Sequence, residues 1–299
     1  MYQIQNAHLY HYWLNTHFIM TLTKISERIY ADTEGTNGGN FGAIVLDDEI
    51  VIIDSGMFHH LTEEAKELLE KDHQLPVLKL LLTHVHADHV WGAQAFNPVT
   101  MISSKRTYDL INEVLKDSWS PAEVIKWAED SKETRPNLWK ASRTLSIMLP
   151  DLVFDESLRI GANQEITMQH VGGHTLGSSI VVIEPEHVCF CGDIIFHRSF
   201  PYAGDPTCDP DKWISVLEDI KNADYSMIIP GHGQLCDNEE IQVIIDFFNE
   251  FREIIKSSIE EGLTPDDFIE RGLTPKYHNE GAEHRERISV EKWFEYYRA

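Results

Sequence analysis

The chain has 299 residues, of which 42% are hydrophobic and 25% are charged, with 25 Lys and Arg against 49 Asp and Glu. This composition is too apolar for a disordered protein, and no apolar run approaches the roughly 20 residues that a membrane helix needs. The formal net charge of −24 repels phosphate backbones. We therefore expect a folded protein that has neither nucleic acid nor a membrane as a partner.

The cysteines are too few for a disulfide framework in a chain of this length, being Cys189, Cys191, Cys208 and Cys236. The first two share one face of a short apolar strand, so we expect them to be buried thiols. The first basic residue is Lys24, so no positively charged segment precedes an apolar core as in a secretory signal peptide. These features favour a cytoplasmic protein.

The first part of the chain is β-rich. Residues 1–19 have no clear periodicity and are expected to form an extension outside the core fold, whereas residues 21–30 predict a strand. Two further runs, 41–46 and 49–54, flank an acidic turn and predict a hairpin.

A helix and a buried strand are predicted next. Residues 60–72 have helical spacing, and residues 77–82 are almost wholly apolar, as in a strand buried on both faces. Residues 104–149 show a helical pattern that Pro121 and Pro136 divide into pieces. This stretch is expected to be a helical insertion.

The second half returns to strands. We expect strands over 158–160, 165–170, 179–183, 188–191 and 226–229, and helices over 211–221 and 239–261. Two successive β-rich halves with helices around them predict a layered α/β protein. A single composite domain accounts for this order better than two separate ones.

The segment Thr83-His84-Val85-His86-Ala87-Asp88-His89 follows the predicted buried strand, at the sheet edge where α/β proteins place ligand sites. Imidazole nitrogens and a carboxylate oxygen suit zinc or iron. The short spacing allows neighbouring side chains to point toward two metals. A solvated histidine-rich loop is the alternative, but it requires neither the aspartate nor partners elsewhere.

Such partners occur at three other predicted strand ends. His174 follows a strand within a glycine turn, Asp193 follows the strand 188–191, and His232 follows the strand 226–229. We expect all of them in strand-end loops, and this shared placement predicts that they converge on the segment 84–89.

The ordered series His-x-His-x-Asp-His at 84–89, His174, Asp193 and His232 resembles the metallo-β-lactamase superfamily of hydrolases, as does Ile53-Asp54-Ser55-Gly56 at the end of a strand. The resemblance covers about residues 21–236. It implies an αββα four-layer sandwich over residues 20–237, including the insertion at about 104–149. Residues 238–299 would be a helical C-terminal extension packed on the same domain.

The resemblance also implies a ligand set with two groups: His84, His86 and His174 for one metal, and Asp88, His89 and His232 for the other. Asp193 would bridge the metals, and Asp54 would orient ligands by hydrogen bonds. The implied cofactor is two Zn²⁺ per chain, with Fe or Mn as alternatives. Asp88 would also be catalytic, orienting a metal-bound hydroxide and carrying its proton to the leaving group.

The likeness is strongest to the glyoxalase II-like and lactonase-like group, because true β-lactamases of the superfamily usually lack an aspartate where Asp193 stands and are exported. We therefore expect a metallo-hydrolase that cleaves an ester, lactone, thioester or related bond in a small molecule. One alternative is a mononuclear iron persulfide dioxygenase, which has the same Thr-His-x-His-Ala-Asp-His motif. Another is a metal-retaining binding protein without turnover.

Residues beyond the ligand set carry weaker signals. His197, Arg198 and Tyr202 follow Asp193 and are expected near the mouth of the site as substrate contacts, the alternative being ordinary loop residues. The tryptophans of the insertion would form a lid or pocket wall, or else pack in the core or at a homodimer face; they are Trp119, Trp127 and Trp139. The remaining histidines are expected to be surface or partly buried side chains, with His170 and His187 inside strands.

Overall fold

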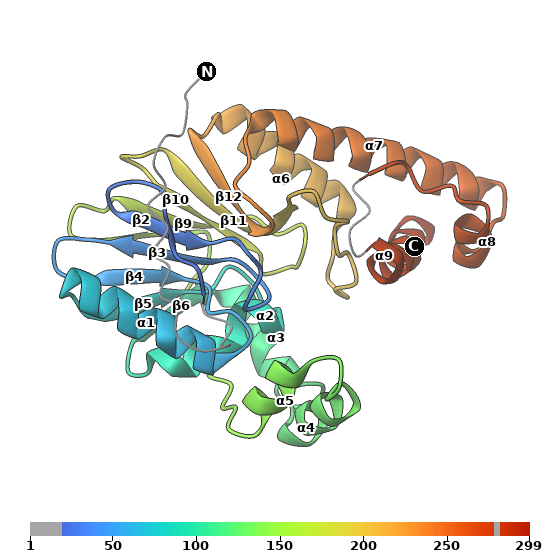
Figure 1. The fold of residues 1–299 in the computed structure, drawn as a ribbon. Coiled ribbons are helices and arrows are strands. Elements are labelled where there is room, and N and C mark those ends of the chain that lie inside the picture. Colours follow the sequence, from blue (N-terminus) through green and yellow to red (C-terminus); the bar gives the residue numbers. More distant parts are fainter. Residues whose placement is uncertain (1–19, 278–281) are drawn as a thin grey trace.

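The computed structural model describes residues 20–277 and 282–299. The extension predicted for residues 1–19 lies outside the described residues. Figure 1 shows two sheets lying face to face, with helices on the outer side of each.

The first sheet has seven strands in chain order: β1 (Thr23–Lys24), β2 (Ile29–Asp32), β3 (Phe41–Val45), β4 (Ile50–Ile53), β5 (Val77–Leu81), β6 (Thr100–Ser104) and β7 (Leu152–Phe154). Neighbours are antiparallel from β1 to β4 and parallel from β4 to β7. The β3–β4 pair confirms the predicted hairpin. From β4 onward the parallel strands direct their C-terminal ends to one edge of the sheet.

The second sheet has five strands: β8 (Ser157–Ile160), β9 (Ile166–His170), β10 (Ser179–Ile183), β11 (Val188–Phe196) and β12 (Met227–His232). They lie in the order β12-β11-β10-β9-β8, and only β11 and β12 among these neighbours are parallel. As a result, β11 and β12 also end at a common edge.

Alternation along the strands builds the layers. In β4, Val51 and Ile53 join an apolar cluster between the two sheets, whereas Ile50 and Ile52 join a cluster under the outer helices. The same alternation separates Val181 from its neighbours in β10. Because successive side chains point to opposite faces, a strand that is apolar throughout needs cover on both sides. The αββα sandwich is confirmed.

Helices on the outer face of the first sheet come from two stretches. They are α1 (His59–His73), α2 (Ala87–Val90), the 3₁₀ helix η1 (Trp91–Phe96), α3 (Lys105–Val114), α4 (Pro121–Asp130) and α5 (Pro136–Ser142). Figure 1 shows α4 and α5 as a lobe beyond the sheet. Trp119 and Trp127 of this lobe each contact the buried Trp91 edge-on, at centroid distances of 5.5 and 5.6 Å.

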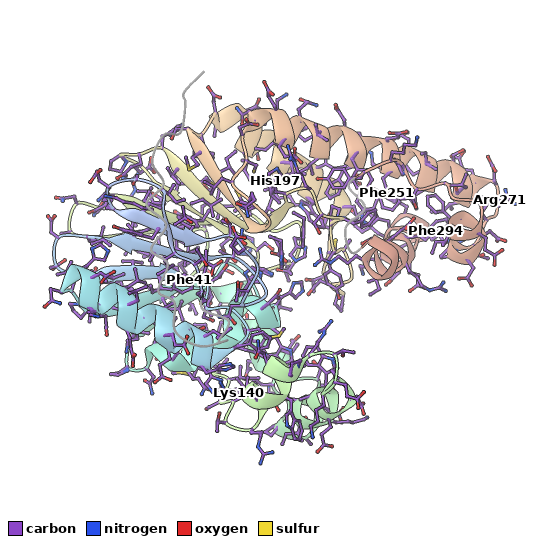
Figure 2. All side chains as sticks on the ribbon, viewed as in Figure 1. Phe41, Lys140, His197, Phe251, Arg271 and Phe294 are labelled. Atoms are coloured by element: carbon purple, nitrogen blue, oxygen red, sulfur yellow. The ribbon has the colours of Figure 1, made fainter. Side chains whose placement is uncertain are left out.

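The second sheet is covered by α6 (Pro210–Ala223), α7 (Asn238–Glu260), α8 (Pro265–Glu270) and α9 (Ala282–Arg298). One apolar cluster contains side chains of β10, β11 and all four helices. At its centre the ring centroid of Phe251 of α7 lies 4.6 Å from that of Trp293 and 6.1 Å from that of Phe268. Figure 2 shows Phe251 and Phe294 directed into the space between α7, α8 and α9. The helices after β12 therefore share a core with the second sheet.

The structure corrects several predicted elements. Residues 21–30 are not one strand, because a turn held by the bond from Ile25 N to Ile29 O separates β1 from β2. Strands β6 and β7, on either side of the insertion, were not predicted. Leu78 in β5 is 45% exposed, so this strand is not buried on both faces along its whole length. His187 lies in the turn between β10 and β11, with φ 54°, and not in a strand.

All four cysteines are buried and free, as expected. The Sγ atoms of Cys189 and Cys191 lie 3.6 Å apart, well beyond the roughly 2.05 Å of a disulfide. Among the residues that the structure describes, no helix has the length and apolar character that crossing a membrane requires.

Replacing Phe251 by Ala tests whether the C-terminal helices and the second sheet form one core. Phe251 is 1% exposed, so we expect the free energy of unfolding to fall by about 3–5 kcal/mol in a single cooperative transition. Val243→Ala is the control on the same helix, because Val243 is 45% exposed and should change stability by about 0.5 kcal/mol or less. Urea unfolding measures both; a loss below about 1 kcal/mol for Phe251→Ala would contradict the shared core.

Candidate metal centre

The seven predicted ligands converge at the strand ends. His84 follows β5, Asp88 and His89 lie on the short helix α2, and His174 precedes β10. Asp193 and His232 belong to the parallel pair β11 and β12. These residues form two groups, each with ligand atoms within 4.8 Å of one another: His84, His86, His174 and Asp193, and Asp88, His89 and His232.

The first group is a cluster of three imidazole nitrogens. His84 Nε2 lies 3.1 Å from His86 Nδ1, which in turn lies 3.0 Å from His174 Nε2. The three rings stand nearly perpendicular to one another, at 81–85°. Three nitrogens directed at one point are the donor set that zinc prefers.

The second group is built around His232. Its Nε2 lies 3.4 Å from Asp88 Oδ2 and 3.4 Å from Asp193 Oδ2. The same Asp193 oxygen lies 3.6 Å from Nε2 of both His84 and His174. A single carboxylate oxygen therefore faces both groups.

Buried atoms without hydrogen bonds test whether these residues fit a metal. His89 Nε2 and Asp193 Oδ1 lie 3.0 Å apart, yet neither forms a hydrogen bond, and both atoms are buried. Such atoms are rare in folded proteins, because each costs roughly 1–3 kcal/mol when it lacks a partner. A cation between the groups would be their partner, and the nitrogen and oxygen donors suit a divalent metal. The residues fit.

Hydrogen bonds behind the ligands select the ring tautomers. Asp54 Oδ2 accepts hydrogen bonds from His89 Nδ1 at 2.8 Å and from Thr83 Oγ1 at 2.7 Å. Thr83 Oγ1 in turn lies 3.0 Å from His84 Nδ1, whose N–H it accepts. With the Nδ1 atoms protonated, the Nε2 atoms of both histidines are left free to bind metal. Asp54 thus links one histidine of each group.

His86 has a separate partner that the sequence did not reveal. Its Nε2 lies 3.2 Å from Asp205 Oδ2, which leaves Nδ1 to face the other two imidazoles. Asp205 is 8% exposed, and its other oxygen accepts bonds from the backbone N and hydroxyl of Thr207. Burial raises the pKa of Asp205, but the His86 ring and Thr207 outweigh this and hold it below the usual range.

Burial and charge set the protonation of the histidines. Burial lowers the pKa of His84 to about 4 and that of His174 well below its ordinary value, so both rings are neutral near pH 7. Burial also lowers the pKa of His89, but the carboxylates of Asp193 and Asp54 outweigh it and raise that pKa. These two carboxylates favour positive charge at His89, and a bound cation would supply positive charge at the same place.

Glycines allow the backbone to approach the ligands closely. A Cβ on Gly231 would lie 2.0 Å from Asp193 Oδ1, and one on Gly38 would lie 2.6 Å from Asp88 Cβ. Gly38 also has φ +90°, a conformation that favours glycine. Any larger residue at either position would displace a carboxylate of the centre.

A cavity of about 390 Å³ lies over the ligands and is called the catalytic cavity below. His86, Asp88, Asp193 and His232 contribute to its lining. Its other walls come from separate parts of the chain: Trp119, Trp127 and Arg135 of the insertion, Met57, Phe196, Tyr202, and Arg285 of α9. The volume lies within the range typical of small-molecule sites.

Of the three predicted substrate residues, Tyr202 lines the catalytic cavity, with its ring 5.6 Å from that of His86. His197 and Arg198 do not line it. His197 is engaged elsewhere, with Nδ1 2.7 Å from Gln234 O and Nε2 3.8 Å from Glu240 of α7 (Figure 2). Arg198 is exposed in a turn with φ 54°. The structure therefore gives these two residues no place at the candidate site.

Asp193 also differs from its predicted setting. It lies within β11, which continues to Phe196, and not in a loop after the strand. The β11–β12 register shifts between Phe190 and Gly192 and again before Phe196. These irregularities keep the strand paired while its side chains turn toward the ligands.

Trp119 and Trp127 combine two of the predicted roles, since both pack on Trp91 and both form a wall of the catalytic cavity. Trp139 instead packs against the core under Lys132 and Arg143, whose charged groups lie 4.8 and 5.4 Å from its ring centroid.

Several characterised proteins resemble this chain. A human protein named acyl-coenzyme A thioesterase MBLAC2 is 24% identical over 70% of this chain and 76% of its own length. Its counterpart from Gallus gallus is 26% identical over 73% of this chain and 79% of its own length. A linear primary-alkylsulfatase of Pseudomonas sp. is 19% identical over 76% of this chain and 48% of its own.

Solved structures share the fold. A metallo-beta-lactamase from Pontibacter korlensis superposes with a TM-score of 0.60 at 18% identity, covering 77% of this chain and 99% of that one. A metallo-beta-lactamase from Hirschia baltica superposes with a TM-score of 0.59 at 18% identity, covering 77% of this chain and 98% of that one. The sequence model of the Metallo-beta-lactamase superfamily matches residues 35–232, a stretch that contains all seven predicted ligands. The chain therefore belongs to the metallo-beta-lactamase superfamily.

Proposed function

We propose that this protein is a dinuclear zinc hydrolase that cleaves the thioester bond of a small molecule carrying an acyl chain. The observation that carries the two-metal part is the position of Asp193 Oδ2, 3.4–3.6 Å from histidines of both ligand groups. Support for the thioester comes from the relatives named acyl-coenzyme A thioesterase, which match over most of their length. The sulfatase relative is likewise named for a substrate with an alkyl chain.

The histidines would hold the metals through nitrogens that the hydrogen bonds to Asp54, Thr83 and Asp205 leave free. Two divalent cations held there would supply a water whose pKa is lowered toward about 7 and a Lewis acid for a carbonyl oxygen. Asp193 would supply negative charge to both groups. The fixed tautomers mean that little reorganisation is needed when the site is loaded.

Asp88 would carry out the proton transfer. It lines the catalytic cavity, with Oδ2 facing His232. Burial raises its pKa, but His89 and His232 outweigh this and keep the pKa below the usual value, so the carboxylate is ionised near pH 7. An ionised Asp88 would accept the proton of the attacking water and deliver it to the departing sulfur.

Positive charge at the cavity supports an anionic substrate. Arg135 and Arg285 line it from opposite parts of the chain, and neither forms an ion pair within the described ranges. Arg285 is held by a hydrogen bond to Ser199 Oγ at 2.7 Å. In a chain of net charge −24, two arginines that have no carboxylate partner among the described residues favour a ligand with a phosphate, sulfate or carboxylate group.

The relatives named acyl-coenzyme A thioesterase favour a hydrolase over the mononuclear iron dioxygenase, which shares the motif at 83–89 but needs a single metal. Metal content distinguishes the two. We expect two equivalents of zinc per chain by elemental analysis, release of free thiol from acyl thioesters, and no oxygen consumption with glutathione persulfide. One iron per chain with persulfide-dependent oxygen uptake would replace the hydrolase by the dioxygenase.

Replacing His84 by Ala tests the metal centre directly. We expect the zinc content of this variant to fall and its kcat/KM on acyl thioesters to drop on the order of a thousandfold or more, because a nitrogen ligand is lost. Removing metal from the unaltered protein with a chelator should have the same effect, and added zinc should restore activity. His170→Ala is the control, since the His170 ring contacts the Leu176 carbonyl through Nε2 and Arg106 through Nδ1 and belongs to neither ligand group. Full activity in His84→Ala would refute the assignment.

Asp205→Ala tests the hydrogen bond that orients His86. We expect zinc affinity to fall by roughly 10- to 100-fold in competition with a chromogenic chelator, with little change in kcat once zinc is saturating. Asp205→Asn retains an acceptor for the His86 N–H and should recover part of the affinity. Asp211→Asn, in the first turn of α6, where Asp211 pairs with Arg252, is the charge-matched control. Equal affinities in all three variants would show that Asp205 does not position the ligand.

A further inference from the structure

A second cavity, of about 410 Å³, lies within the helical insertion and is called the insertion cavity. It lies between the end of α3, helix α4 and the segment after α5. Its lining is mainly apolar: Leu115, Trp119, Val124, Ile125, Leu145 and Ile147. Two serines and Arg143 supply most of the polar part. None of the predicted metal ligands lines this cavity.

Trp119 joins the two cavities. It lines the insertion cavity and also the catalytic cavity, and the edge contact with Trp91 at 5.5 Å holds its ring. The two cavities therefore share the Trp119 side chain as a wall. Ile125, further along this surface, is 44% exposed. The lining on the insertion-cavity side of Trp119 is mainly apolar.

We propose that the insertion cavity binds the acyl chain of the substrate while its thioester lies at the metal ligands. This inference rests on the proposed function and adds the location and the apolar nature of the chain subsite. The volume is within the 300–1,000 Å³ typical of ligand pockets, and the apolar lining matches a saturated chain. The shared wall makes the substrate a better occupant than a second copy of the protein, which would have no reason to reach the metal ligands.

The arrangement separates two tasks. Arg285 of α9 lines the catalytic cavity from a part of the sequence remote from the insertion. It is suited to an anionic group on the leaving part of the substrate. The insertion cavity would bind the other part, and each methylene group buried there should raise kcat/KM about fourfold. Chain length is therefore the variable that reports on this site.

Ile125→Trp tests the proposal by filling the insertion cavity from its exposed side, where a larger side chain is tolerated without repacking the core. The readout is kcat/KM of the zinc-loaded protein on saturated acyl thioesters from acetyl to hexadecanoyl. We expect the ratio of dodecanoyl to acetyl kcat/KM to fall on the order of tenfold or more, since about two methylene groups lose their contacts. Val243→Trp, at a residue 45% exposed on α7, is the matched control and should leave the profile unchanged.

Binding of dodecanoate, measured by calorimetry, separates this inference from the proposed function. If Ile125→Trp weakens dodecanoate binding while the unaltered protein hydrolyses no thioester, the chain subsite stands and the thioesterase proposal fails. If thioesters are hydrolysed but neither the length profile nor dodecanoate binding changes in Ile125→Trp, the subsite is refuted. A change in oligomeric mass in Ile125→Trp would also refute it, because the cavity would then be an interface between copies.

Discussion

The carboxylate of Asp193 is the constraint on which the rest of the centre depends. It is 4% exposed in a strand that is buried along its whole length, so its charge needs compensation inside the protein. Four imidazoles from three separate parts of the chain surround it, at 3.0–3.6 Å. Burial raises its pKa, but these histidines outweigh burial and hold the pKa well below its ordinary value.

This requirement explains features that would otherwise be unrelated. The register shifts of β11 turn Asp193 toward the ligands, and Gly231 on β12 leaves space for its Oδ1 atom. The parallel pairing of β11 and β12 brings His232 to the same edge. Asp54, with φ 58°, then links His89 and His84 through one carboxylate oxygen and Thr83. The register shifts of β11 and the positive φ of Asp54 are departures from regular strand geometry that position side chains of the centre.

The convergence of the seven predicted ligands could be anticipated because it depends on short-range signals. A buried strand followed by three histidines and an aspartate, and three further polar residues at later strand ends, predicts convergence without knowledge of the fold. Asp205 gave no such signal. It lies 119 residues from His86, in an irregular segment, and only the three-dimensional path of that segment brings the two together.

Nearness in sequence was a poor guide to the substrate contacts. His197 and Arg198 follow Asp193 closely, but β11 continues to Phe196, and the turn after it directs His197 toward Gln234. The residues that do form the cavity walls, such as Trp119 and Arg285, come from the insertion and from α9. Strands β6 and β7 were not predicted because both are short and neither has a distinctive pattern; β6 lies between β5 and β7, and β7 is at the edge of the sheet.

The place where the insertion leaves the sheet has a consequence for how such proteins diversify. Helices α3 to α5 depart from β6 and return to β7, the last two strands at one edge of the first sheet, whereas the ligands come from β5, α2, β11, β12 and the turn before β10. An exchange of residues 115–149 between relatives would therefore alter what the cavity accepts without passing through any strand that holds a ligand. Under the proposed function, a change of substrate preference through residues 115–149 would leave the strands that carry the predicted ligands intact.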